Sequence, residues 1–275
     1  MAPTRKARGA RTAPALAPVH DRRPPRRARA AVLVLHGGRA DALEAPPPLN
    51  LPALRMRPFA RAIARATAHD DVLVAHVRYE RRGWNGDHAH PVADTQRALA
   101  ELRDLVGPVP VVLVGHSMGA RAALRAAADP GVTGVVALAP WCPPAEPAAH
   151  LRGRTVCAFH DEADRITSAE DTWAYLTRAQ SAGARVRGLR MPHGGHAMLR
   201  QARRWHRLTA ETTAALLGVA PFPSALAERP VWNGSPPRCT RPGEATAPGV
   251  RSHPAGRTSL DPCASVPSLP SAGCR

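Results

Sequence analysis

The stretch VVLVGHSMG at residues 111–119 decides how the rest of the chain is interpreted. Its four leading apolar residues predict a buried strand, and the alanine-rich residues after it predict a helix that can approach a sheet closely. Between them lies the pattern G-x-S-x-G, formed by Gly115, Ser117 and Gly119. The two glycines omit the side chains that would clash in a very tight turn. We therefore predict a turn that lifts the Ser117 hydroxyl out of the carboxyl edge of a sheet.

Outward from this turn, short apolar runs alternate with helical patterns through residues 31–220. The runs lie at residues 31–35, 72–77, 111–114, 135–138, 155–159 and 186–190. Several are continuous, which is typical of strands buried on both faces of a parallel sheet. Apolar residues have helical spacing at 92–106 and 198–216. We therefore predict an α/β fold, a mostly parallel, doubly wound sheet with helices on both faces.

Composition limits the class of protein. Of the 275 residues, 44% are hydrophobic, which is enough for a core. No apolar run is long enough to span a bilayer as a helix, so we expect no membrane span. The five cysteines show neither C-x-x-C spacing nor a cluster with histidine, so we expect neither a zinc module nor a disulfide scaffold.

The two ends of the chain differ from the middle. Residues 1–30 contain nine Arg and Lys, one Asp and no hydrophobic periodicity, which predicts a disordered basic arm. Clustered arginine attracts phosphate, but we interpret this arm as a solvated tail and expect no nucleic-acid partner. Residues 221–275 contain 11 prolines and predict a Pro-rich disordered tail. We expect one folded domain at 31–220.

The arm also bears on localisation. It lacks the apolar stretch that follows the basic part of a secretory signal, so we expect a cytoplasmic protein. The sequence does not indicate an oligomeric state.

Two clusters that follow predicted strands hold partners for Ser117. They are HDEAD at 160–164 and MPHGGH at 191–196. The carboxyl ends of parallel strands meet at one edge of a sheet, so both clusters lie at the edge that bears Ser117. A neutral histidine can accept the serine proton, and a carboxylate can fix the histidine tautomer. The residues alone leave open whether the acid is Asp161 or Asp164, and whether the base is His193 or His196.

The body resembles the α/β-hydrolase superfamily, specifically its compact bacterial serine hydrolases and esterases. The resemblance covers about residues 31–218 and rests on LHGG at 35–38, GHSMG at 115–119, DRIT at 164–167 and GHA at 195–197. It implies a nucleophile elbow and a catalytic triad of Ser117, Asp164 and His196. It also implies an oxyanion hole formed by backbone N–H groups of Gly38 or Arg39 and of Met118. No metal and no organic cofactor is expected.

The chain departs from the pattern of that family in two ways. No strand is indicated before the run at 31–35, where family members often have one. No long insertion lies between residues 139 and 155, so we expect no large cap domain.

Other chemistry-bearing residues give weaker signals. The stretch DHAH at 87–90 has alternating histidines suited to a metal, but no third cluster completes a site, and we interpret it as a polar loop. The stretch WCPP at 141–144 could line the pocket. The stretch RYERRGW at 78–84 could bind an acidic or aromatic part of a substrate, or could be a solvated basic loop.

We expect a serine hydrolase that cleaves an ester or a related acyl bond, a thioester or lactone included, in a small-molecule acyl substrate. The reaction would pass through an acyl-enzyme intermediate. The alternative is a non-catalytic binding protein on a hydrolase fold, which engages acidic partners through its basic arms. The complete triad favours the enzyme, because a scaffold has no need of all three residues. Salt-sensitive DNA binding without esterase activity would favour the alternative.

Overall fold

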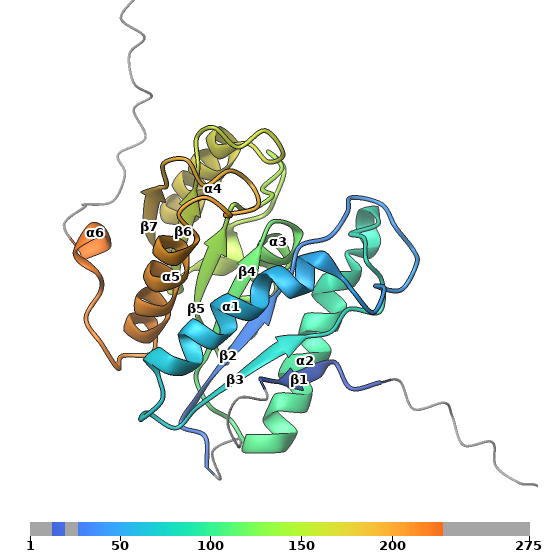
Figure 1. Cartoon of the computed structure of the whole chain (residues 1–275), viewed down its shortest axis with the longest axis vertical. Coiled ribbons are helices and arrows are strands. Elements are labelled where there is room, and N and C mark those ends of the chain that lie inside the picture. The colour runs from blue at the N-terminus through green and yellow to red at the C-terminus, as the bar shows by residue number, and fades with distance from the viewer. Residues whose placement is uncertain (1–12, 20–26, 228–275) are drawn as a thin grey trace, which may run out of the picture. The chain divides into compact units, whose positions relative to one another are not determined.

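A seven-stranded sheet forms the centre of the structure (Figure 1). The computed structural model describes residues 13–19 and 27–227, all within the first of two units of the chain, Met1–Gly234. The strands are β1 (Leu16–Pro18), β2 (Ala30–Leu35), β3 (Val72–Val77), β4 (Val111–His116), β5 (Val132–Leu138), β6 (Thr155–His160) and β7 (Arg185–Arg190). Their order is β1-β3-β2-β4-β5-β6-β7, and within it only β1 runs antiparallel to its neighbour.

The register of the parallel strands brings their carboxyl ends to one edge of the sheet. Leu35 of β2 pairs with Gly115 of β4, and Gly115 pairs with Ala137 of β5. Farther along the sheet, His160 of β6 pairs with Arg190 of β7. The loops that follow β2, β4, β6 and β7 therefore begin at the same edge. These loops and the first residue of the helix Met118–Ala126 contain the residues predicted for the triad and the oxyanion hole.

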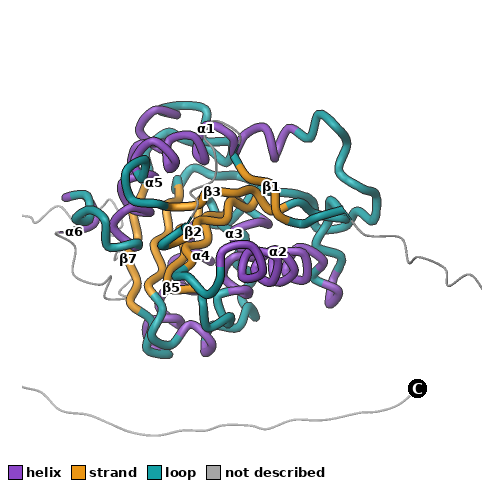
Figure 2. The backbone as a smooth tube through the Cα atoms, turned by 90° about the horizontal axis from the view of Figure 1, so that it is seen from below, coloured by secondary structure: helices purple, strands orange, loops and turns teal. Residues whose placement is uncertain are grey.

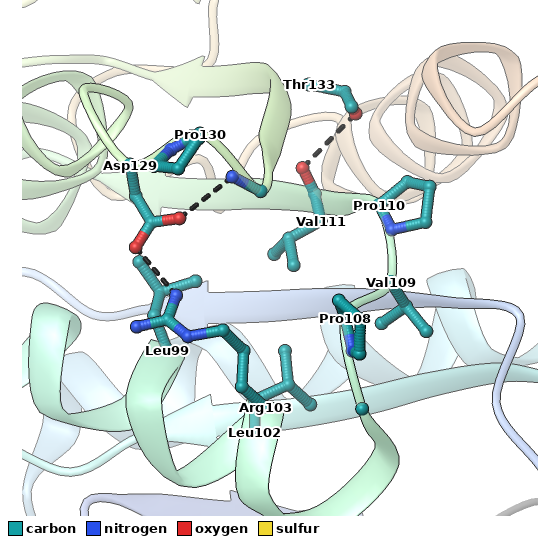
Figure 3. Close-up of a pocket in the computed structure, with 12 residues that line it drawn as sticks. Leu99, Leu102, Arg103, Pro108, Val109, Pro110, Val111, Asp129, Pro130 and Thr133 are labelled. Carbon is teal, nitrogen blue, oxygen red and sulfur yellow. Dashed lines mark hydrogen bonds and ion pairs between the residues drawn. The ribbon is translucent and has the colours of Figure 1, made fainter.

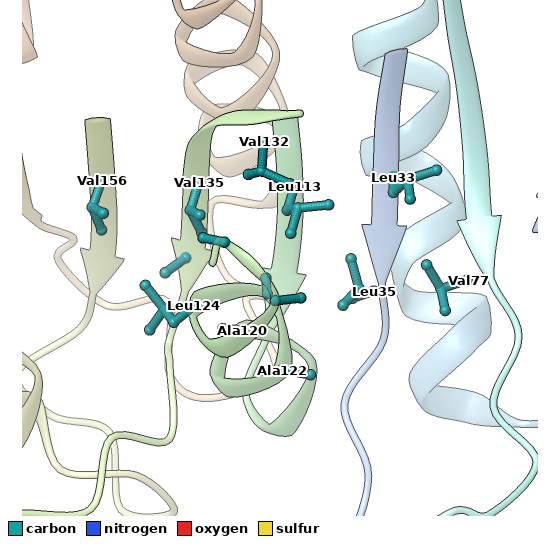
Figure 4. Packing of buried hydrophobic residues seen from close by; sticks show 14 of the residues in the cluster. Leu33, Leu35, Val77, Leu113, Ala120, Ala122, Leu124, Val132, Val135 and Val156 are labelled. Carbon is teal, nitrogen blue, oxygen red and sulfur yellow. The ribbon is translucent and has the colours of Figure 1, made fainter. Parts of the chain in front are cut away.

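Helices cover both faces of the sheet (Figure 2). They are α1 (Leu51–Ala66), α2 (His90–Val106), α3 (Met118–Ala126), α4 (Ala169–Ser181), α5 (Ala202–Leu216) and α6 (Ser224–Ala227), with the short 3-10 helices η1 (Gly86–His88) and η2 (Ala149–Leu151). One hydrophobic cluster packs α2, α3 and α4 against Leu33 and Leu113 of the sheet. Figure 4 shows the two leucines with Ala120 and Leu124 of α3. A second packs α1 and α5 against Val34 and Val112. Because successive strand residues point to opposite faces, burial on both faces explains the continuous apolar runs.

The predicted fold class is confirmed. The six predicted runs correspond to β2 through β7, and the helical patterns at 92–106 and 198–216 correspond to α2 and α5. Between β5 and β6 the chain forms only η2, so there is no large cap domain. None of the helices in the described ranges combines the length and the apolar character that a bilayer crossing requires.

The prediction of a disordered arm at residues 1–30 is wrong where the structure describes that segment. Leu16–Pro18 forms β1, which pairs with β3, and Ala15 and Leu16 are buried. The Glu101 carboxylate of α2 accepts hydrogen bonds from the N–H groups of Ala15 and Leu16 at 2.9 and 2.8 Å. A distant helix and a sheet edge hold this strand, so local periodicity could not reveal it. Residues 1–12 and 20–26 lie outside the described residues.

The prediction of a disordered tail beginning at residue 221 is also wrong for its first residues. Leu226 in α6 is 1% exposed. The Arg187 guanidinium of β7 lies 4.4 Å from the centre of the Phe222 ring and donates a hydrogen bond to the Leu226 carbonyl at 2.5 Å. The folded part of the chain therefore extends at least to Ala227. The rest of the predicted tail, 228–275, lies outside the described residues.

Candidate active site

Ser117 lies in a strained turn between β4 and α3. Its backbone has φ 54° and ψ −119°, a conformation that side-chain-bearing residues rarely adopt. The turn depends on the two flanking glycines. A Cβ on Gly115 would lie 2.4 Å from the Gly119 carbonyl oxygen. A Cβ on Gly119 would lie 2.4 Å from the His36 carbonyl oxygen. Any other residue at either position would push the elbow away from the neighbouring backbone.

A hydrogen-bond chain joins Ser117, His196 and Asp164. The Ser117 Oγ lies 3.0 Å from Nε2 of His196, and Nδ1 of His196 lies 2.8 Å from Oδ2 of Asp164. Ser117 is 8% exposed, and the Asp164 carboxylate is fully buried. Three loops that are far apart in the sequence supply these residues, after β4, β6 and β7. The arrangement gives the serine hydroxyl a base and gives that base an orienting carboxylate.

Asp164 is held as a carboxylate by several donors. Besides His196, the ring of His160 reaches its Oδ2 through Nε2 at 3.2 Å, and the N–H groups of Ile166 and Thr167 donate to its Oδ1 at 2.8 and 3.2 Å. Burial alone would raise the pKa of the Asp164 carboxyl. The hydrogen bonds from His160, His196 and Ile166 outweigh burial and hold that pKa well below its usual range. Asp164 is therefore charged at any pH near neutral.

The geometry distinguishes the two carboxylates and the two histidines that the sequence left open. Asp161 makes no hydrogen bond to His196 among the described residues; its oxygens accept hydrogen bonds from the N–H groups of Gly195 at 2.6 Å and Ala163 at 3.0 Å. Burial opposes the ionisation of Asp161, but these backbone donors lower its pKa. His193 is exposed at a loop position with φ 52°. The structure therefore brings Asp164 and His196 to Ser117, while Asp161 braces the loop that bears His196.

Of the three N–H groups predicted for an oxyanion hole, one is already engaged. The Arg39 N–H donates to the Arg82 carbonyl at 3.1 Å, within a bridge between Arg39 and Gly83. No hydrogen bond within the described residues engages the N–H groups of Gly38 or Met118. Gly38 also packs tightly on Met118, since a Cβ on Gly38 would lie 2.3 Å from the methionine Cε. The inclusion of Arg39 among the donors is therefore wrong.

His36 orients the peptide that precedes the Gly38 N–H, and sequence reasoning did not single it out. Its Nδ1 donates to the Gly37 carbonyl at 2.7 Å, and the Asn50 amide lies 3.4 Å from its Nε2. Burial lowers the pKa of His36 to about 4, although the bond to Gly37 opposes this, so the ring is neutral near pH 7. The Gly37 carbonyl and the Gly38 N–H belong to one planar peptide group. Fixing the carbonyl therefore fixes the direction of the N–H.

His116, the residue before Ser117, supports the opposite side of the site. Its Nε2 donates to the backbone carbonyl of His196 at 2.9 Å. Burial and the nearby His196 ring lower the pKa of His116 to about 3, so it stays neutral. A signal for both supporting histidines existed in the sequence, because each stands directly beside a glycine of the HGG or GHSMG pattern.

An arginine that contacts two tryptophan rings anchors the short loop between β5 and β6. The Arg121 guanidinium lies 3.9 Å from the centre of the Trp84 ring and 4.4 Å from that of Trp141. Its Nε donates to the buried Glu146 carboxylate at 2.5 Å, and Arg125 donates to the same carboxylate. Sequence reasoning placed the two tryptophans near the pocket but missed Glu146, which holds the loop 139–148 to α3.

The remaining candidates do not join the site. The rings of His88 and His90 lie 5.3 Å apart, and within the described parts of the chain no group of three His, Cys, Asp or Glu side chains could hold a metal ion. A largely apolar cavity of about 500 Å³ lies at the opposite, amino edge of the sheet (Figure 3). It is lined by Leu99, Leu102 and Pro110, among others, with the Arg103–Asp129 ion pair at its side. It contains none of the predicted site residues.

Comparison with known proteins agrees with this architecture. A family profile described as the alpha/beta hydrolase fold matches residues 30–188, more than half of the chain. The chain belongs to this family. No curated protein matches this α/β hydrolase significantly in sequence.

Many solved structures share the fold of this α/β hydrolase. An esterase/lipase from an uncultured bacterium is 17% identical, with 72% of this chain and 80% of that chain covered and a TM-score of 0.55. An α/β serine hydrolase homologue from Coxiella burnetii is 14% identical, with coverages of 68% and 86% and a TM-score of 0.51. A serine hydrolase without a lid from Xanthomonas campestris is 18% identical, with coverages of 75% and 89% and a TM-score of 0.50.

Proposed function

We propose that this α/β hydrolase is a serine esterase that cleaves a carboxylic ester, or a related acyl bond, of a small-molecule substrate. The observation that supports the proposal is the chain of hydrogen bonds from Ser117 through His196 to Asp164, at 3.0 and 2.8 Å. A binding scaffold would not require a serine in a strained turn with a base and a buried carboxylate behind it.

In the proposed mechanism, the Ser117 Oγ attacks the substrate carbonyl carbon. His196 accepts the hydroxyl proton at Nε2, while Asp164 holds Nδ1–H and stabilises the imidazolium without becoming protonated. The N–H groups of Gly38 and Met118 donate to the oxyanion of the tetrahedral intermediate, and Met118 does so from the first position of α3, where the helix dipole favours negative charge. His196 then gives its proton to the departing alcohol oxygen, which leaves Ser117 acylated.

The second half of the reaction uses the same groups. Water takes the place of the alcohol, His196 accepts its proton, and the hydroxyl oxygen attacks the acyl carbon. Collapse of the second tetrahedral intermediate returns the proton from His196 to the Ser117 Oγ and releases the carboxylic acid. No step calls on a group from outside the chain other than water and the ester.

An active-site-directed organophosphonate tests the proposal directly. We expect one adduct per chain, mapped by mass spectrometry to Ser117, and none in Ser117→Ala. The same variant should lose ester turnover by about 10⁴-fold or more. Ser168→Ala is the matched control, since Ser168 caps α4 outside the triad. An adduct on another residue, or full activity in Ser117→Ala, would overturn the proposal. An ester chain-length profile of the unmodified protein then defines the acyl group.

A further inference from the structure

Large apolar side chains are exposed mainly at one edge of this hydrolase. Among the described residues seven stand out, and five of them lie at the carboxyl edge around the Ser117 site, 62–77% exposed: Leu43, Leu49, Leu51, Ile166 and Leu199. The other two, Leu105 and Val219, lie at the amino edge, at the ends of α2 and α5. Scattered exposed leucines are ordinary, but their gathering around one site marks an interaction surface.

Three of the five lie where α1 and α5 begin, and we call Leu49, Leu51 and Leu199 the α1/α5 rim. The two helix starts are tied together. Arg55 of α1 donates from Nη1 to the Ala197 carbonyl at 2.5 Å, and the Phe59 ring of α1 contacts the His206 ring of α5 at 4.4 Å. Ala197 directly follows His196, so the rim borders the candidate active site.

The outer surface of the same two helices is strongly basic. Residues 49–67 contain four arginines and no acid, and residues 197–217 contain four arginines and one glutamate, a net charge of +7 over the two segments. Seven of these eight arginines are exposed: Arg57, Arg61, Arg65, Arg200, Arg203, Arg204 and Arg207. The one acid, Glu211, pairs with Arg207 at 3.2 Å. Within these two segments, basic side chains therefore outnumber acidic ones eight to one beside the leucines of the rim.

We propose that the α1/α5 rim and its arginines form a docking surface for an anionic lipid bilayer. Exposed leucine inserts among acyl chains while neighbouring arginine binds lipid phosphate, and the two together hold a protein at an anionic surface. The proposal rests on the proposed function for its purpose: an ester in the lipid layer would reach Ser117 without crossing water. A nucleic acid would satisfy the arginines, but its phosphates have no contact to offer three exposed leucines.

Vesicle co-sedimentation of the full-length chain tests the surface without relying on catalysis, because it is done with Ser117→Ala. We expect binding to vesicles of phosphatidylcholine with about one third phosphatidylglycerol, little binding to phosphatidylcholine alone, and loss of binding in high salt. Replacing Leu49, Leu51 and Leu199 by serine should weaken binding about tenfold or more. The matched control, Leu105→Ser with Val219→Ser, removes exposed apolar groups at the other edge and should leave binding unchanged.

A second set of variants separates the alternatives. Changing Arg57, Arg203 and Arg204 together to glutamine should weaken binding to the anionic vesicles. The same three changes, made in the chain that keeps Ser117, should leave kcat/KM on a monomeric soluble ester unchanged. Unchanged vesicle binding in both the leucine and the arginine variants would overturn the proposal, since another segment would then be responsible. So would arginine variants that lose only duplex-DNA binding, or leucine variants that alter only the oligomeric state on size-exclusion chromatography.

Discussion

Asp161 and Asp164 lie in one loop, three residues apart, and their replacement by asparagine should have opposite consequences. In the parent protein, Nδ1–H of His196 donates a hydrogen bond to the Asp164 carboxylate at 2.8 Å. In Asp164→Asn the side-chain amide would instead present an N–H donor to Nδ1. The ring would then be held with its proton on Nε2, pointing at Ser117, and could not accept the hydroxyl proton. We expect kcat to fall by about 10⁴-fold, with KM nearly unchanged.

Asp161→Asn keeps one amide oxygen that can still accept from the Gly195 N–H, now at 2.6 Å. That bond becomes a neutral one, and the bond from the Ala163 N–H is lost because an amide NH₂ group cannot accept it. We expect the unfolding free energy to fall by about 1–2 kcal/mol. For a domain of this size the melting temperature would drop by about 2–8 °C. The loop that bears His196 should shift little, so kcat should fall by about tenfold or less.

Steady-state kinetics on a small soluble ester and thermal unfolding, run on both variants and the parent, give the comparison. Circular dichroism at the assay temperature establishes that each variant is folded. The assignment would be refuted if Asp161→Asn lowered kcat more than Asp164→Asn, or if Asp164→Asn kept more than about a tenth of the parent kcat.

Four further outcomes are expected. The pKa of Asp164 is lower in the folded protein than in the unfolded chain, so its carboxylate stabilises the fold above the unfolded pKa of about 3.9 and loses this effect as pH falls. Asp164→Asn should therefore lose less stability than the parent on acidification below about pH 4, measured by urea unfolding. Glu146→Gln leaves two arginines beside a buried neutral amide and should cost about 3 kcal/mol in the same measurement, with only partial rescue by Arg125→Gln. Gly38→Ala should lower kcat about 10²–10³-fold by displacing one oxyanion donor, and should also lower the melting temperature, because the added Cβ would lie 2.4 Å from the Arg82 carbonyl oxygen. A chain ending at Ala227 should match the full-length melting temperature, whereas one ending at Ala220 should lose about 2–4 kcal/mol with the burial of Phe222 and Leu226; equal stability of the two chains would contradict the packing of α6.

The sheet was predictable because its strands are buried on both faces. Such strands read as mostly apolar runs, as β2, β4 and β6 do, whereas the edge strand β7 carries three arginines and is only partly buried. β1 was not predictable: Leu16–Pro18 is three residues long, and its stability comes from pairing with β3 and from the Glu101 carboxylate 85 positions away. The helix α6 is similar, since Arg187 in β7 holds it. Segments fixed by distant partners leave no local period to detect.

The site shows the same division. Ser117 follows from the two glycines that its turn requires, and those are local. The choice between Asp161 and Asp164 depends on which carboxylate faces His196 across two loops, so the residues alone left it open. The engagement of the Arg39 N–H by Arg82 depends on how the loop after β3 meets the loop after β2. The supporting role of His160 likewise comes from a buried hydrogen bond to Asp164 that no sequence pattern indicates.

The strained backbone of Ser117 lowers the stability of the fold at the residue that the proposed reaction needs. A non-glycine residue at φ 54° and ψ −119° costs about 1–3 kcal/mol, and the fold bears this cost whether or not substrate is present. Glycine would adopt the same conformation without that strain, so Ser117→Gly should fold at least as stably as Ser117→Ala while having no nucleophile. Selection for thermostability alone would therefore favour replacing Ser117 by glycine. Engineers who seek a more robust form of this protein should leave position 117 fixed and search for stability elsewhere.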